Sequence, residues 1–234
     1  MQLVERCAAS FDFIHASTAL TRAAKLMQGP LSADEEHCLA QLLHVAGRQL
    51  EQCGAWALAN MAWALAKLNY KDPAFVQRLV RQACVQLPSF DAQNTTNTLS
   101  ALARLRYEDR AFMRQLFAIA RAELHDFNVQ DISNTLWAMA KLQHVTADRQ
   151  LVQDSLTHAQ PQLPHFTELA LANTAWSLAT LRHHDQNFME HLLQQFLAKM
   201  AGFDPQHISN TLWALATFRH SDPAFVDRAV KIGP

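Results

Sequence analysis

The chain has 234 residues, half of them apolar, and a formal net charge of −1, which excludes a disordered polypeptide and a globally basic nucleic-acid binder. Glycine is scarce, with five residues, while Ala and Leu abound, and this balance favours helix over sheet. The four cysteines fit neither a zinc signature nor a dense disulfide framework, so we expect reduced and mostly buried thiols. No apolar run approaches the length of about 20 residues that spans a bilayer, so we expect no membrane insertion.

A string of nine residues that begins with Asn recurs along the chain. It reads Asn-Met-Ala-Trp-Ala-Leu-Ala-Lys-Leu from Asn60, and four further copies begin at Asn97, Asn134, Asn173 and Asn210. Successive copies are 37, 37, 39 and 37 residues apart, and a weaker copy begins at Thr18. Such a period is the signature of a repeat architecture. We predict one α-solenoid over residues 1–234, with repeats at 11–52, 53–89, 90–126, 127–165, 166–202 and 203–234, the last incomplete.

Helix-start signals divide each repeat into two helices. The first helix, helix A, is predicted to follow a Phe and a capping residue, as at Phe11-Asp12, Phe90-Asp91, Phe127-Asn128, Phe166-Thr167 and Phe203-Asp204. The second, helix B, is predicted to begin after Asp72, Asp109, Asp185 and Asp222. In the third repeat, helix A should run from Asp91 to Leu105 and helix B from Arg110 to about Glu123. The sequence therefore predicts an all-α fold of helical hairpins.

Apolar periodicity indicates which face of helix A is buried. Ile132, Leu136, Met139 and Leu142 recur at helical spacing and form one apolar stripe, which a single hairpin could not bury. Stacked repeats would bury it, so we predict a right-handed superhelix. Four tryptophans lie three residues after an asparagine of the repeat: Trp63, Trp137, Trp176 and Trp213. We favour the interpretation that they pack between repeats over the alternative that they stack on a ligand.

The period of 37 to 38 residues and the Asn-Thr-Leu-Trp-Ala-Leu-Ala-Lys-Leu strings resemble octotricopeptide repeats, the helical-hairpin arrays of green-algal organelle gene-expression factors. The resemblance covers nearly the whole chain and is strongest over residues 53–234. It implies binding of single-stranded organellar RNA, in a mitochondrion or chloroplast, in support of RNA processing, transcript stability, translation or ribosome assembly.

Helix A also carries a polar stripe, which in the fourth repeat comprises Asp131, Asn134, Ala138 and Lys141. An asparagine can offer both a donor and an acceptor to an unstacked base, and the residue three positions earlier varies between repeats. The candidate base-reading residues are the asparagines Asn60, Asn97, Asn134, Asn173 and Asn210 with the variable Asn94, Asp131 and His207. The asparagines could equally hold neighbouring repeats together, and the sequence leaves both roles open.

Basic residues cluster after each asparagine, with no acidic residue between the asparagine and the turn before helix B. Those that could contact phosphates are Lys67, Arg104, Arg106, Lys141, Arg182 and Arg219. Cations at these places also complement the negative end of the helix dipole, and both roles can hold together.

Signatures of enzymes are missing from the sequence: it has no glycine-rich phosphate loop, no serine elbow and no His-Glu-x-x-His string. His183, His184 and His191 have no cysteine or carboxylate partner at ligand spacing, so we expect surface histidines rather than a metal site. We expect no catalytic activity and no cofactor. The alternative to an RNA binder is a scaffold that holds proteins together in a large organellar complex such as the mitochondrial ribosome.

Overall fold

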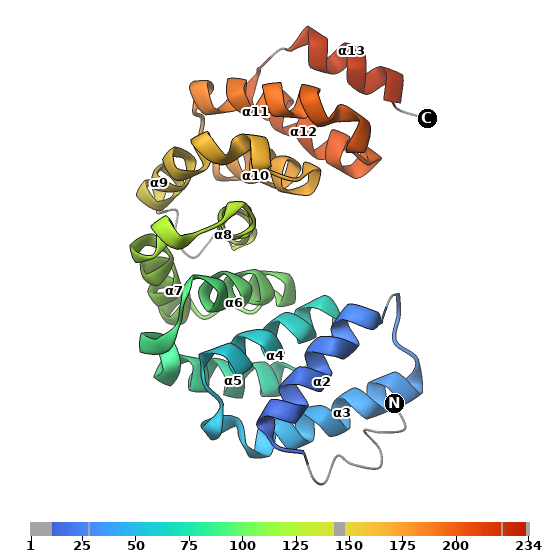
Figure 1. Ribbon diagram of the computed structural model, residues 1–234, viewed down its shortest axis with the longest axis vertical. Coiled ribbons are helices and arrows are strands. Elements are labelled where there is room, and N and C mark those ends of the chain that lie inside the picture. The colour runs from blue at the N-terminus through green and yellow to red at the C-terminus, as the bar shows by residue number, and fades with distance from the viewer. Residues whose placement is uncertain (1–10, 28, 143–147, 221, 233–234) are drawn as a thin grey trace. The chain divides into compact units, whose positions relative to one another are not determined.

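The structure is a computed structural model, and it describes residues 11–27, 29–142, 148–220 and 222–232. These residues form α-helices and short 3₁₀ turns and no β-strand, so the predicted all-α fold is confirmed (Figure 1). The twelve α-helices of the described residues are α2 (Phe13–Leu26), α3 (Ala33–Arg48), α4 (Ala55–Lys67), α5 (Pro73–Gln86), α6 (Ala92–Leu105), α7 (Arg110–Ala122), α8 (Val129–Lys141), α9 (Arg149–Ala159), α10 (Glu168–Leu181), α11 (Gln186–Lys199), α12 (Pro205–Phe218) and α13 (Pro223–Ile232).

The predicted helix starts are confirmed in atomic detail. The side chain of Asp91 accepts a hydrogen bond from the N–H of Asn94 at 2.7 Å, and that of Asp109 accepts from the N–H of Phe112 at 3.0 Å. Each such bond satisfies one of the unpaired N–H groups at a helix N-terminus. The Phe that follows the helix B cap is buried in every case in which it is described, as at Phe75, Phe112, Phe188 and Phe225. Cap and core residue together therefore fix where helix B begins.

Two compact units make up the chain, residues 1–119 and 120–234. In the first unit, α4 packs against α2 and α6, while α3 and α5 pack on α2 and α4. In the second unit, α10 packs against α8 and α12, while α9 and α11 pack on α8 and α10. Each unit thus has a layer of A helices side by side and a layer of B helices behind it (Figure 1). The right-handed sense and the single-domain organisation stay predictions.

The core of each unit lies between these two layers. The predicted apolar stripe of α8 is buried, because Ile132, Leu136, Met139 and Leu142 have little or no exposed surface. Small residues such as Ala138 and Ala175 are also buried, where they allow neighbouring A helices to approach closely. Ser133 adds a polar contact, since its hydroxyl donates to the carbonyl oxygen of Ala170 across α8 and α10 at 3.3 Å. In α4, α6, α8 and α10, packing of the A helices thereby leaves one narrow face of the helix accessible to solvent.

Candidate nucleic-acid interface

A row of four side chains follows the accessible face of helix A in α4, α6, α8, α10 and α12, and only Ser100 of α6 is buried among them. We call this row the open stripe. In α8 it consists of Gln130 and Lys141, which are exposed, and of Asn134 and Trp137, which are half-buried. These positions lie at steps of four, three and four residues, which place them on one helical face. The equivalent residues are Trp56, Asn60, Trp63 and Lys67 in α4; Gln93, Asn97, Ser100 and Arg104 in α6; Leu169, Asn173, Trp176 and Thr180 in α10; and Gln206, Asn210, Trp213 and Thr217 in α12.

The open stripe differs from the polar stripe that the sequence predicts. Asn134 and Lys141 belong to both, but Asp131 is 8% exposed and Ala138 is fully buried. The other variable residues, Ala57, Asn94 and Ala170, are buried as well, and His207 is half-buried. The variable position that faces solvent is instead the second residue of the helix, which sequence reasoning missed. A base-reading role for Asn94, Asp131 and His207 stays a prediction, but their side chains are poorly accessible.

Asp131 and His207 have a structural task at the start of their helices. The carboxylate of Asp131 accepts from the N–H of Asn128 at 3.1 Å, while the side chain of Asn128 accepts from the N–H of Asp131 at 3.1 Å. In α12, His207 Nδ1 accepts from the N–H of Asp204 at 3.4 Å. Such reciprocal pairs are capping boxes, which stabilise a helix terminus. The third residue of helix A therefore serves the fold in at least these two repeats.

We expect Asp131→Ala to lower the free energy of unfolding by about 1 kcal/mol, because it removes the acceptor for the N–H of Asn128. The exposed neighbour Gln130→Ala provides a matched control and should change it by no more than about 0.5 kcal/mol. Urea denaturation followed by circular dichroism measures both values. Equal stability of the two variants would contradict the structural role of Asp131.

The five asparagines are half-buried, so none of them is sealed between repeats. In two repeats the side-chain amide is oriented by the residue one turn earlier. Gln130 Nε2 donates to Asn134 Oδ1 at 2.9 Å, and Gln206 Nε2 donates to Asn210 Oδ1 at the same distance. Because the two carboxamides bind each other on the surface of their helix, they present a fixed pair of polar groups to solvent.

Three tryptophans of the second unit lie on neighbouring A helices. The rings of Trp176 and Trp213 have centroids 6.4 Å apart, and Lys141 Nζ lies 5.6 Å from the ring centroid of Trp137 and 4.6 Å from that of Trp176. The distances to Lys141 are those of cation–π contacts. Trp137 and Trp176 are half-buried and Trp213 is 47% exposed. The rings thus contribute to the contact between repeats, as predicted, and also offer part of their surface to solvent.

Cations lie at the C-terminal end of the helix A layer. Lys67, Arg104 and Lys141 are exposed in the last turns of α4, α6 and α8. Arg106, Arg182 and Arg219 are exposed immediately after α6, α10 and α12. Each has a φ of 53°, in the left-handed region that glycine and asparagine tolerate best. Asn69 occupies the equivalent place after α4, with a φ of 51°. Three repeats therefore have an arginine at a position where its left-handed backbone conformation is unfavourable.

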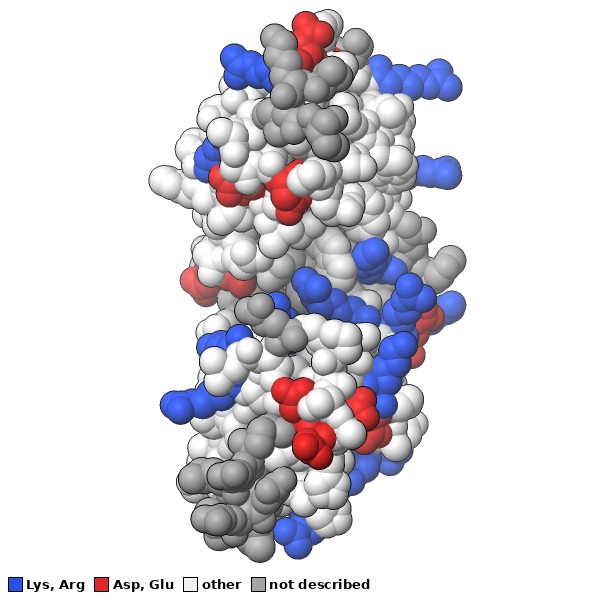
Figure 2. Space-filling model, turned by 90° about the vertical axis from the view of Figure 1, so that its right-hand side faces the viewer, with Lys and Arg blue, Asp and Glu red and all other residues white. Residues whose placement is uncertain are grey.

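Figure 2 shows that Lys and Arg side chains project from the edges of the face drawn there, with Asp and Glu side chains between them. The basic residues of the chain number 20 and the acidic residues 21, so any attraction for a polyanion must come from local groups of cations. The groups at the ends of the A helices meet that condition, because no acidic residue of the chain falls between each asparagine and the turn after it.

The turn between α10 and α11 is held to α9 by a polar cluster. His183 Nε2 lies 2.9 Å from Gln153 Oε1, and Gln153 Nε2 donates to Asp185 Oδ2 at 3.1 Å. Burial lowers the pKa of His183, so its ring is neutral at neutral pH. His191 Nδ1 lies 2.8 Å from the carbonyl oxygen of Asn187. No group of His, Cys, Asp and Glu within the described residues could hold a metal ion.

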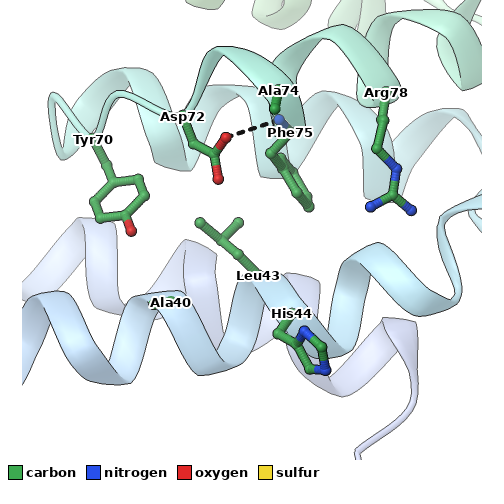
Figure 3. Close-up of a pocket in the computed structure, with 8 residues that line it drawn as sticks. All are labelled: Ala40, Leu43, His44, Tyr70, Asp72, Ala74, Phe75 and Arg78. Carbon is green, nitrogen blue, oxygen red and sulfur yellow. Dashed lines mark hydrogen bonds between the residues drawn. The ribbon is translucent and has the colours of Figure 1, made fainter.

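A second candidate site is an open pocket of about 300 Å³ between α3 and α5 (Figure 3). Its polar groups serve the local fold: Asp72 Oδ1 accepts from the N–H of Phe75 at 2.9 Å, and the Arg78 guanidinium donates to the carbonyl oxygen of Gly47. Burial raises the pKa of Tyr70, so its hydroxyl is protonated at neutral pH. Asp72 and Arg78 thus make a capping contact and a bridging contact within the fold.

The three cysteines within the described residues show no sign of an activated thiol. Cys38 and Cys53 are buried and Cys84 is exposed, and burial raises the pKa of Cys53 to about 11. The predicted burial thus holds for two of these three cysteines; Cys7 lies outside the described residues. None of the helices that the structure describes is both long enough and apolar enough to cross a membrane.

Layered A and B helices with a repeated polar and aromatic stripe define a helical-repeat protein. Residues 68–187, just over half of the chain, match the family model of the Tbc2 translation factor, N-terminal domain. The chain belongs to this family. None of the curated proteins matches the chain. The narrower resemblance to octotricopeptide repeats stays a prediction.

Proposed function

We propose that the chain binds single-stranded or ribosomal RNA through the open stripes of its A helices and acts in organellar gene expression, in RNA processing, transcript stability, translation or ribosome assembly. The observation that carries this proposal is the repeated composition of the stripe. Helices α4 and α8 carry an amide, an aromatic ring and a cation within about three helical turns, and α6 carries the amide and the cation.

These groups suit the chemistry of single-stranded RNA. Exposed amides hydrogen-bond to base edges, partly exposed rings stack with bases, and cations contact phosphates. The family description adds support, since it names a translation factor. Because each unit has its own A helices, each would contact RNA on its own layer. Mitochondrion and chloroplast are both compatible with this role.

The test is fluorescence anisotropy of the whole chain with a labelled random single-stranded RNA of about 15 nucleotides at two or more salt concentrations. An RNA binder should bind with a logarithmic affinity that falls linearly with the logarithm of salt concentration. Absence of binding at low salt would reject the proposal.

The second candidate function is a protein scaffold. The exposed apolar side chains of the open stripe favour it, because Trp56, Leu169 and Trp213 are 54%, 47% and 47% exposed and would suit a protein partner. We propose in either case that the chain has no catalytic activity and needs no cofactor. The raised pKa of Cys53 disfavours a reactive thiolate at that residue.

A further inference from the structure

In the five A helices from α4 to α12, the second residue is a variable and exposed member of the open stripe. It is Trp56 in α4, Gln93 in α6, Gln130 in α8, Leu169 in α10 and Gln206 in α12. All five side chains are exposed, whereas the next residue along the helix is buried in four of these helices. The side chain at this accessible position is Trp, Gln or Leu, depending on the repeat.

This position acts directly on the asparagine of the same repeat. In α8 and α12, two of the three helices in which it is Gln, the Gln amide donates to the Asn carbonyl oxygen at 2.9 Å. The Asn amide nitrogen then remains as a donor beside the Gln carbonyl oxygen, which is an acceptor. A donor beside an acceptor is the pattern with which side chains distinguish base edges. In α10, Leu169 has no amide, so Asn173 presents its carboxamide without that partner.

A ring lies beside each of these groups in the second unit. Trp137, Trp176 and Trp213 each follow the asparagine by three residues and share its face, with part of the ring accessible. Stacking on a ring would hold a base next to the amides while adding little preference of its own. The arrangement separates the group that holds a base from the groups that select it.

We infer that the second residue of helix A, acting with the asparagine one turn later, sets the base preference of its repeat, so that the α8 and α12 repeats prefer the same base and the α10 repeat a different one. This inference rests on the proposed RNA-binding function. The partner is single-stranded RNA, because the stripe combines base-sized aromatic surface with cations that complement phosphates.

The experiment is selection of RNA from a fully randomised library of about 15 nucleotides by the whole chain, followed by sequencing of the bound pool. Leu169→Gln and Gln130→Leu are the test variants, and both replace exposed side chains. Each should change the preferred base at one position of the enriched motif, with a change in enrichment of about five- to tenfold. Overall affinity and salt dependence should stay close to those of the wild type.

Matched controls are Val85→Gln and Gln77→Leu, the same kinds of exchange at exposed positions of α5, a helix B. They should leave the motif unchanged. If the wild type enriches a motif and neither Leu169→Gln nor Gln130→Leu alters it, the inference fails while RNA binding stands. If the wild type enriches no RNA and shows no binding in anisotropy, the proposed function fails too, and a protein scaffold becomes the better account. Thermal unfolding of each variant verifies that it is folded.

Discussion

Simultaneous replacement of Lys67, Arg104 and Lys141 with Gln should weaken RNA binding about 100-fold at low salt. Each cation is exposed in the last turn of an A helix, and three contacts of about 1 kcal/mol each give that factor. Each lost contact with a single strand should also reduce the salt slope by about 0.7, so the total reduction should be about two units. Anisotropy titrations over a range of salt concentrations measure both quantities.

Three exposed cations of the B helices provide the control, with Arg81, Arg114 and Arg149 changed to Gln. This variant has the same net charge as the test variant, but we expect it to keep most of the affinity. If the two triple variants lose affinity equally, the A helices are not the phosphate-binding layer. Stability should change modestly in the test variant, because a cation near a helix C-terminus contributes about 0.3 to 1 kcal/mol at low ionic strength.

Replacement of Arg106, Arg182 and Arg219 with Asn should raise stability and lower RNA affinity at once. Each arginine has a φ of 53°, and Asn adopts this left-handed conformation more readily than Arg. A gain of about 0.5 kcal/mol per site would raise the melting temperature of the triple variant by about 3 to 6 °C. Loss of three cations should weaken RNA binding by about tenfold or more at low salt.

The chain itself provides the precedent for this exchange, because Asn69 already occupies the same place with a φ of 51°. Differential scanning calorimetry and anisotropy on the same preparations give the two readouts. A variant that becomes more stable without losing affinity would show that these arginines do not contact RNA. A variant that loses stability would show that the arginine side chains stabilise the turns by contacts of their own.

Helix boundaries could be predicted from the sequence because capping is a local interaction. Asp91 and Asp109 begin their helices where the sequence places them, and α6 and α7 end within one residue of their predicted ends. A side chain that caps the N–H three residues later needs no information from distant parts of the chain. Regular spacing of these local signals then determines the number and order of the helices.

The accessible face was harder to predict, because Asn134 and Lys141 lie on the line between two possible stripes. Asn134 and Lys141 are seven positions apart, about two helical turns, and both stripes contain them. One stripe adds Asp131 and Ala138 on one side of the helix, and the other adds Gln130 and Trp137 on the other side. Asp131 and Ala138 are both buried, and their burial depends on packing between A helices, which lie 37 to 39 positions apart in the sequence. Close approach of the A helices also places a small residue such as Ala138 inside, while Trp137 is only half-buried.

Exposure of the second residue of helix A, next to a third residue that is buried, has an evolutionary consequence. Substitutions at Gln130 or Leu169 encounter no core constraint, so random mutation can sample all side chain types there without unfolding the protein. Single codon changes at these positions could therefore give the protein a new target. They would not lower its stability, so the protein could follow a change in its target sequence. The same separation makes these positions suitable for directed evolution of new binding preferences.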